Sequence, residues 1–178
     1  MASPDAVRLL DFYRETSPDH CGRYLRDILQ WSDRDLEDVH NYIQWLFPTF
    51  ERSSFQPDVP ILTREIADAF RADHMVQRRL AASFDRMLRF YGFGMIRGAS
   101  LAIAPASNFN ERAIVWLKPS NHNHLRITRI LKSIAALGMQ EEAIAFFNSL
   151  KELYENSLEV RSVVQDVSFR FWRLSVTG

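Results

Sequence analysis

The stretch Asn121–Leu137, NHNHLRITRILKSIAAL, decides the fold class of this chain. Four of its apolar residues recur at helical spacing and form one stripe, namely Ile127, Ile130, Leu131 and Ile134. Pro119 breaks the chain before the stretch, and Gly138 directly after it is a natural C-terminal stop. The pattern therefore predicts a strong helix that is capped by Ser120 or Asn121 and runs to Leu137.

Other helix boundaries follow from the same kind of signal. Ser32 with Asp35 resembles a capping pair and opens a helix that is expected to end at Phe47, before a proline. Two further helices are expected near the end of the chain, over about residues 140–155 and 158–175. Helical signals thus extend from the first third of the chain to its last residues.

Residues 92–107, GFGMIRGASLAIAPAS, are the least regular stretch. Gly92 is a natural stop for the helix before it, and the stretch is either a long loop or contains a short strand-like piece. No repeat, low-complexity segment or domain linker is evident. We therefore expect an all-α fold, in which residues 1–178 form a single-domain bundle of about seven to eight helices.

Composition excludes several functional classes. The chain has 22 Lys and Arg against 22 Asp and Glu, so it lacks a net charge that would attract nucleic acid or an anionic membrane. Its one cysteine, Cys21, cannot form an internal disulfide. No apolar run approaches the ~18 residues of a membrane-spanning helix, and Met1–Asp11 lacks the blocks of a signal peptide. We expect a soluble, cytoplasmic protein without a membrane span.

The first informative segment is His40–Pro48, HNYIQWLFP. On a continuous helix, one apolar face would hold Leu36, Val39, Ile43, Leu46 and Phe47. Tyr42 and Trp45 would point to the other side, as in a central helix with two packed neighbours. His40 and Gln44 would lie one turn apart at the edge of the apolar face. They are either hydrogen-bonded within the fold or line a cleft.

The second informative segment is Ser120–Ser133, SNHNHLRITRILKS. Beside the apolar stripe, an arc of roughly 60° holds His122, Arg126, Arg129 and Ser133. This row starts at a helix N-terminus, where free N–H groups favour an anion. Two arginines one turn apart can bind a carboxylate or a phosphate. The alternative is that both arginines pair with acidic residues on neighbouring helices.

Familiar catalytic and cofactor motifs are missing. His122 and His124 point about 200° apart on a helix and cannot share a metal ion. Cys21 beside His20 lacks a third group to orient a dyad. The glycines of the 92–94 stretch lack the third glycine of a nucleotide loop and follow a helix rather than a strand. We therefore expect no catalytic residue, no metal and no cofactor, although enzymatic activity stays open.

HNYIQWLFP and SNHNHLRITRILKS closely resemble the two signature stretches of the opioid growth factor receptor conserved-domain family, and RMLRFYG between them resembles its helix end followed by glycine. The resemblance covers the chain from about Phe12 to the last helices. It suggests a short, single-domain member of microbial origin. The matching signature positions are His40, Tyr42, Gln44, Trp45, Pro48, Asn121, His122, Asn123, Arg126, Thr128 and Arg129.

The resemblance implies binding rather than catalysis. Animal members bind an enkephalin-type opioid peptide, lie at the nucleus and restrain cell growth. We therefore expect a non-catalytic binding domain for a peptide, a protein or a small anionic ligand, with nucleic acid an unlikely partner. We further expect the two signature helices to pack together around one site. The expected ligand-binding residues are His40, Gln44, Trp45, Asn121, His122, Asn123, Arg126 and Arg129.

Two alternatives remain open at this stage. One is an enzyme or a small-anion-binding protein built on a pocket of His122, Arg126 and Arg129. The other is a purely structural or oligomerisation domain, in which the arginine row is an internal hydrogen-bond network.

Overall fold

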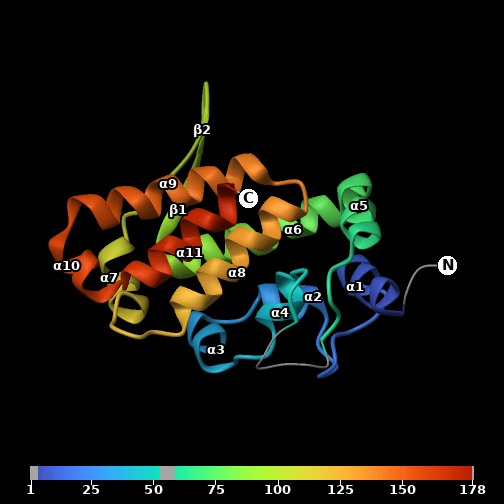
Figure 1. Cartoon of the computed structure of the whole chain (residues 1–178). Coiled ribbons are helices and arrows are strands. Elements are labelled where there is room, and N and C mark those ends of the chain that lie inside the picture. Colours follow the sequence, from blue (N-terminus) through green and yellow to red (C-terminus); the bar gives the residue numbers. More distant parts are fainter. Residues whose placement is uncertain (1–3, 53–58, 178) are drawn as a thin grey trace. The chain divides into compact units, whose positions relative to one another are not determined.

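The computed structural model describes residues 4–52 and 59–177. The chain divides into two compact units, Met1–Arg86 with Ala136–Gly138, and Met87–Ala135 with Met139–Gly178, and each is described by itself. The expectation that residues 1–178 form one domain stays a prediction. Among the described residues there are eleven helices and one two-stranded sheet (Figure 1). None of these helices is both long enough and apolar enough to cross a membrane.

The first unit is built mainly from short helices, of which α3 and α5 begin at side-chain caps. The elements are α1 (Pro4–Arg14), α2 (Leu25–Leu29), α3 (Asp33–Asp38), α4 (Ile43–Leu46), α5 (Arg64–Ala72) and α6 (His74–Tyr91) as far as Arg86. The predicted capping pair is confirmed, because the Ser32 hydroxyl accepts from the Asp35 backbone N–H at 3.1 Å and the Asp35 carboxylate accepts from the Ser32 N–H. Thr63 caps α5 by accepting from the Ile66 N–H at 3.3 Å.

Aromatic side chains fill the core of the first unit. Phe12 lies 5.2 Å from Trp45 between ring centroids, and Tyr13 lies 4.8 Å from Phe70. The hydroxyl of Tyr13 donates to the carbonyl of Leu46. These rings are buried, so burial of aromatic area holds α1, α4 and α5 together. Trp45 is therefore a core residue of this unit.

The prediction of one continuous helix from Ser32 to Phe47 is wrong. The chain leaves helical geometry at Val39, whose ψ of 132° is extended, and re-enters it at Ile43. Side chains in the break bond elsewhere: His40 Nδ1 lies 2.9 Å from the Asp38 carbonyl oxygen, and Asn41 binds Arg23. The His40 contact is local and competes with the helix, the Asn41 contact ties the break to a residue 18 positions away, and a β-branched valine favours extended backbone. His40 and Gln44 therefore do not share a helix face.

The second unit begins with the last turn of α6 and a β-hairpin. Its other elements are β1 (Phe93–Arg97), β2 (Leu101–Pro105), α7 (Phe109–Trp116), α8 (Asn123–Ala136), α9 (Gln140–Asn156), α10 (Leu158–Val163) and α11 (Asp166–Thr177). In Figure 1 the hairpin stands out from the helices. Its antiparallel register pairs Phe93 with Pro105 and Met95 with Ile103. The ring centroids of Phe93 and Phe146 of α9 are 5.4 Å apart. This contact anchors the base of the hairpin in the core.

Two features of this unit correct the expected fold class. The fold is mostly helical rather than purely all-α, because the irregular stretch 92–107 contains both strands of the hairpin. The helix expected over 158–175 is interrupted at Val164, whose ψ of 105° is extended, and so becomes α10 and α11. The same kind of break separates α3 from α4. These breaks help to explain why the described part of the chain has eleven helices instead of seven to eight.

Candidate functional site

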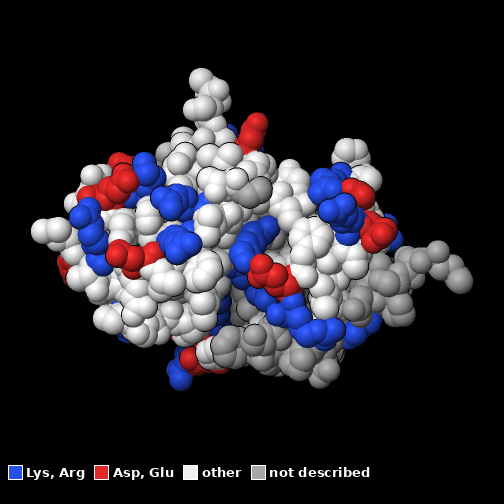
Figure 2. Space-filling view, in the orientation of Figure 1, with Lys and Arg blue, Asp and Glu red and all other residues white. Residues whose placement is uncertain are grey.

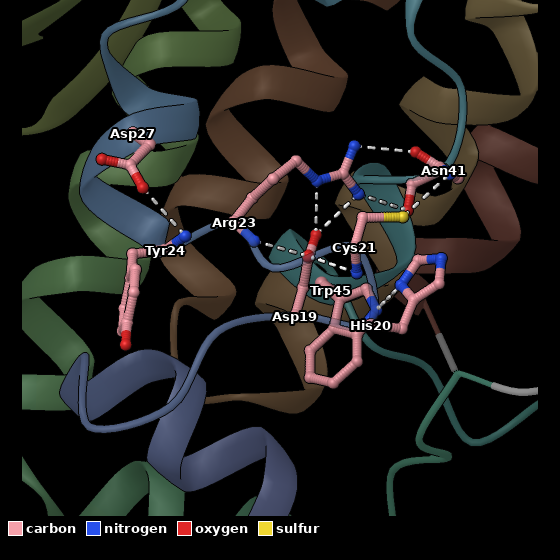
Figure 3. A network of polar contacts seen from close by, with 8 residues as sticks. All are labelled: Asp19, His20, Cys21, Arg23, Tyr24, Asp27, Asn41 and Trp45. Carbon is pink, nitrogen blue, oxygen red and sulfur yellow. Dashed lines mark hydrogen bonds and ion pairs between the residues drawn. The ribbon is translucent and has the colours of Figure 1, made fainter.

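A polar network in the first unit surrounds Asp19 (Figure 3). This carboxylate, in the loop before α2, is only 5% exposed. One of its oxygens accepts from the backbone N–H groups of Cys21, at 2.8 Å, and Arg23, at 3.0 Å. The other accepts from Nε of Arg23 at 2.7 Å and lies 2.6 Å from its Nη2. Such a carboxylate has no lone pair left for another partner.

Arg23 joins this loop to the break between α3 and α4. Its Nη1 donates to the side-chain oxygen of Asn41 at 2.8 Å, and its Nη2 donates to the Asn41 carbonyl at 3.3 Å. The Asn41 amide in turn donates to the sulfur of Cys21 at 3.4 Å. Asn41, in the break of the predicted helix, is therefore hydrogen-bonded to the loop that contains Cys21 and Arg23.

His20 is held by Trp45. The indole N–H donates to His20 Nδ1 at 2.8 Å, and the two rings stack with centroids 6.0 Å apart (Figure 3). Because an indole nitrogen only donates, Nδ1 must be the unprotonated nitrogen, and the neutral ring carries its proton on Nε2. With Nδ1 engaged and Nε2 protonated, His20 is poorly placed to act as a base toward Cys21.

Asp19, His20 and Cys21 also form the kind of cluster that can bind a metal ion. One potential ligand atom from each lies within 4.8 Å of the others. However, Asp19 is saturated by Arg23 and two backbone groups, and His20 Nδ1 is occupied by Trp45. Binding a metal would require the loss of both sets of bonds. The donor set therefore fits a structural network better than a metal centre.

The other expected site residues of the first segment have different environments. His40 is exposed, whereas Gln44 is 6% exposed and Trp45 is 1% exposed. The side-chain oxygen of Gln44 accepts no hydrogen bond from any residue in the described ranges. Trp45 supports His20 from within the core. That these three residues bind a ligand stays a prediction.

In the second unit, the two asparagines of the signature build the start of α8. Asn121 donates to the carbonyl of Val115 at 3.1 Å and accepts from the Asn123 backbone N–H at 2.8 Å. Asn123 is fully buried and accepts from the hydroxyl of Tyr91 and from Arg126 Nη1, both at 3.3 Å. These contacts join the end of α7 to α8, so both asparagines have a structural role.

His124, which helix geometry excludes from a metal pair with His122, is buried inside the second unit. Its Nε2 lies 3.0 Å from the carbonyl oxygen of Trp116. Its own carbonyl accepts from the indole of Trp172 and the hydroxyl of Thr128, both at 3.0 Å. Burial lowers the pKa of His124 below its ordinary value of 6.5, since desolvation disfavours the charged ring. Its position on the apolar side of the helix is the signal for this role.

The lowered pKa makes stability depend on pH. Because the unfolded chain binds the His124 proton more readily, we expect this contribution to be complete above about pH 6.5 and to be lost as pH falls toward the folded-state pKa. Urea unfolding at about pH 7.5 and about pH 5.5 should show a larger loss for wild type than for His124→Gln, whose side chain does not titrate. An equal loss in both proteins would contradict this assignment.

The remaining residues of the row on α8 are buried to different degrees. Arg126 is 4% exposed and Ser133 is fully buried, whereas His122 and Arg129 are half-buried. The row therefore lies along a partly covered side of the helix, with His122 and Arg129 the more accessible members. His40, Gln44 and Trp45 belong to the first unit and this row to the second, so a shared site of the two segments stays a prediction.

Comparison with known proteins identifies the family. The model of the opioid growth factor receptor conserved region matches residues 3–176. The chain belongs to this family. The human opioid growth factor receptor is 39% identical over 137 residues, which are 74% of this chain and 20% of the receptor. The rat receptor is 41% identical over 122 residues, which are 67% of this chain and 21% of the receptor.

A second group of relatives is named opioid growth factor receptor-like protein 1. The protein from Xenopus tropicalis is 32% identical over 176 residues, which are 89% of this chain and 33% of the relative. The chain thus spans about a fifth to a third of the length of these relatives. They are vertebrate proteins and give no support to the expected microbial origin. No solved structure matches the chain.

Proposed function

We propose that this domain is a non-catalytic binding module that recognises a peptide, through an anionic group of that peptide. Two relatives are named as receptors for an opioid growth factor, and the chain matches the conserved region of their family. Because the chain spans only about a fifth of those receptors, receptor function is carried over here as a proposal. A cytoplasmic location is part of the same proposal.

The proposal that the domain is non-catalytic is supported by the hydrogen bonds that already occupy the side chains of Asp19 and His20. The grouping closest to a catalytic or metal constellation in the described residues is Asp19, His20 and Cys21. Its carboxylate is saturated by Arg23, and its imidazole is held by Trp45. A base must have a free nitrogen near the nucleophile, and this arrangement offers none at Nδ1. The cluster is therefore assigned to the fold.

The proposal of peptide binding is supported by the row of polar side chains on α8 that includes His122, Arg126 and Arg129. His122 lies at the N-terminal end of a 14-residue helix, and Arg129 follows two turns later, with both side chains half-buried. The first N–H groups of α8 are bonded to Asn121 and His122, so a bound anion would be held by a guanidinium, which binds carboxylates with two parallel hydrogen bonds. Every unmodified peptide ends in a carboxylate, which is the anion we assign to this row. Arg126 is too buried to be the first contact, so the proposal rests on Arg129.

Calorimetric titration with an opioid peptide tests the proposal. We expect saturable binding that weakens by about tenfold when the peptide carboxylate is amidated, and by a similar factor in Arg129→Glu. Arg34→Glu is the matched control, since that arginine is 89% exposed on α3 and should not affect binding. Binding that ignores amidation, or an equal loss in Arg34→Glu, would contradict the assignment to α8. Failure of a broad peptide array to yield any saturable ligand would overturn the function.

A further inference from the structure

α11 has apolar residues on two opposite faces. Trp172 and Val176 are buried on one face. On the other face, Val167, Phe171 and Leu174 are 50%, 45% and 49% exposed. Their spacing of four and three residues places these three side chains on one side of a helix. We call these three residues the α11 stripe.

The buried face holds α11 firmly, which fixes the direction of the stripe. The indole of Trp172 donates to the carbonyl of His124 at 3.0 Å, and Gln140 donates to the carbonyl of Val176 at 2.9 Å. Phe169 stacks on Tyr154 of α9 with ring centroids 4.1 Å apart. Figure 1 shows α11 between α8 and α9 in this unit. The stripe is therefore a preformed surface, because the helix cannot rotate to bury it.

Two arginines flank the stripe on one side. Arg170 lies three residues after Val167 and four before Leu174, and Arg173 follows on the same flank; both are exposed. Neither side chain forms a hydrogen bond or an ion pair with a residue in the described ranges. Figure 2 shows basic groups, with acidic groups close to them, beside uncharged surface where α11 lies in Figure 1.

Other arginines of the chain contrast with this pair. They bind carboxylates within the fold, as Arg14 does with Asp73, Arg79 with Glu15 and Arg86 with Asp33. The acid of α11 itself, Asp166, accepts from the hydroxyl of Tyr154. Asp166 lies four residues before Arg170 and keeps its negative charge while it accepts from Tyr154, so two arginines against one carboxylate leave the flank of the stripe net positive.

We propose that the α11 stripe is the docking surface for an acidic amphipathic helix of a partner protein. Apolar anchors four and three residues apart are the spacing by which one helix recognises another. Glutamates or aspartates along the edge of the partner helix would face Arg170 and Arg173, so that the charges are complementary. The surface lies on α11 and is separate from the peptide site proposed on α8, so the two can be tested independently.

Charge decides between the possible occupants. A second copy of this chain would bring two more arginines and only one carboxylate, Asp166, to the stripe, so two net positive flanks would face each other. An anionic membrane would satisfy the arginines, but a single row of three apolar side chains on a fixed helix gives little area to insert. A helix with matching apolar spacing and acidic edges satisfies both features of the surface.

Fluorescence anisotropy with a designed probe tests the proposal. The probe is a labelled helical peptide of about 18 residues, about five turns, with leucines at matching spacing and glutamates along both edges. Its partner probe has lysine in place of each glutamate. With the full chain, we expect saturable binding of the glutamate peptide, at least about tenfold weaker binding of the lysine peptide, and loss of affinity as salt rises.

Variants locate the binding on the chain. Phe171→Ser and the double variant Arg170→Glu with Arg173→Glu should each weaken binding of the glutamate peptide by about tenfold or more. Leu158→Ser is the matched control, because that leucine is 81% exposed on α10 and lies outside the stripe. All the substituted side chains are exposed, and circular dichroism melting of each variant verifies that the fold is retained.

Several results would overturn the proposal. One is the absence of saturation at about 1 mM chain, and another is equal binding of the two peptides. Equal weakening by Leu158→Ser would assign the binding to another surface. Co-sedimentation with anionic lipid vesicles in place of peptide binding would make α11 a membrane contact. A dimer in analytical ultracentrifugation that is abolished by Phe171→Ser would make it a self-association face.

Discussion

Asp19→Ala is expected to lower the free energy of unfolding by about 3–5 kcal/mol, as removal of one partner from a buried ion pair does. The carboxylate accepts two backbone N–H bonds and the bidentate guanidinium of Arg23, and its side chain is fully buried. Its loss leaves those donors without an acceptor. It also releases Arg23 from the position in which it holds Asn41.

Chemical denaturation and thermal melting would measure this effect, which corresponds to a drop in melting temperature of about 10 °C for a chain of this size. Asp38→Ala is the matched control, because its contact with Arg34 spans 3.4 Å between side chains that are 64% and 89% exposed. Exposed pairs of this kind contribute little, so the control should melt with wild type. A similar, small loss in both variants would show that the Asp19 network does not stabilise the fold.

Asp19→Asn separates charge from shape. The asparagine oxygen can still accept from the N–H groups of Cys21 and Arg23, but its amide would face the guanidinium with donor against donor. We expect Asp19→Asn to lose most of what Asp19→Ala loses. A nearly wild-type stability of Asp19→Asn would mean that the two backbone bonds, rather than the ion pair, hold this corner.

Local signals predicted the long helices well and the breaks poorly. The helix from Asn123 to Ala136, its glycine stop and the Ser32 cap all follow from residues close together in the chain. The interruption at Val39 depends on the bond between Asn41 and Arg23, which are 18 positions apart. Hydrophobic periodicity continues through the break, so the pattern alone predicts one helix where tertiary contacts favour two.

The sequence pattern predicted which polar residues belong to the candidate site. It did not predict which of them bond within the fold and which are accessible. Asn121 and Asn123 belong to one motif with His122 and Arg129, yet the asparagines satisfy backbone and tyrosine groups inside the fold. Helical spacing gives the direction of a side chain, and it says nothing about which neighbour meets it. The Asp19 network could not be predicted, because Asp19 and Arg23 are ordinary residues in sequence and Asn41 falls within the stretch that predicts a continuous helix.

Gly92→Ala, at the base of the hairpin, is expected to lower the free energy of unfolding by about 2–5 kcal/mol. Gly92 ends α6 with φ at +85°, a region that costs an L-residue roughly 1–2 kcal/mol. A methyl group there would also lie 2.9 Å from Cβ of Arg112 and 2.9 Å from the backbone Cα of Phe109. Such overpacking adds about 1–3 kcal/mol, because backbone cannot move aside cheaply.

Gly94→Ala, two residues further on in β1, is the control for this prediction. An added methyl group there meets nothing within 4 Å. Alanine in the interior of a strand is favoured over glycine by roughly 0.5–1 kcal/mol, so Gly94→Ala should match or exceed wild-type stability. Urea unfolding of the two variants side by side measures the difference. If both variants unfold at the wild-type midpoint, then α7 does not pack against the turn at Gly92 as tightly as the distances to Phe109 and Arg112 require.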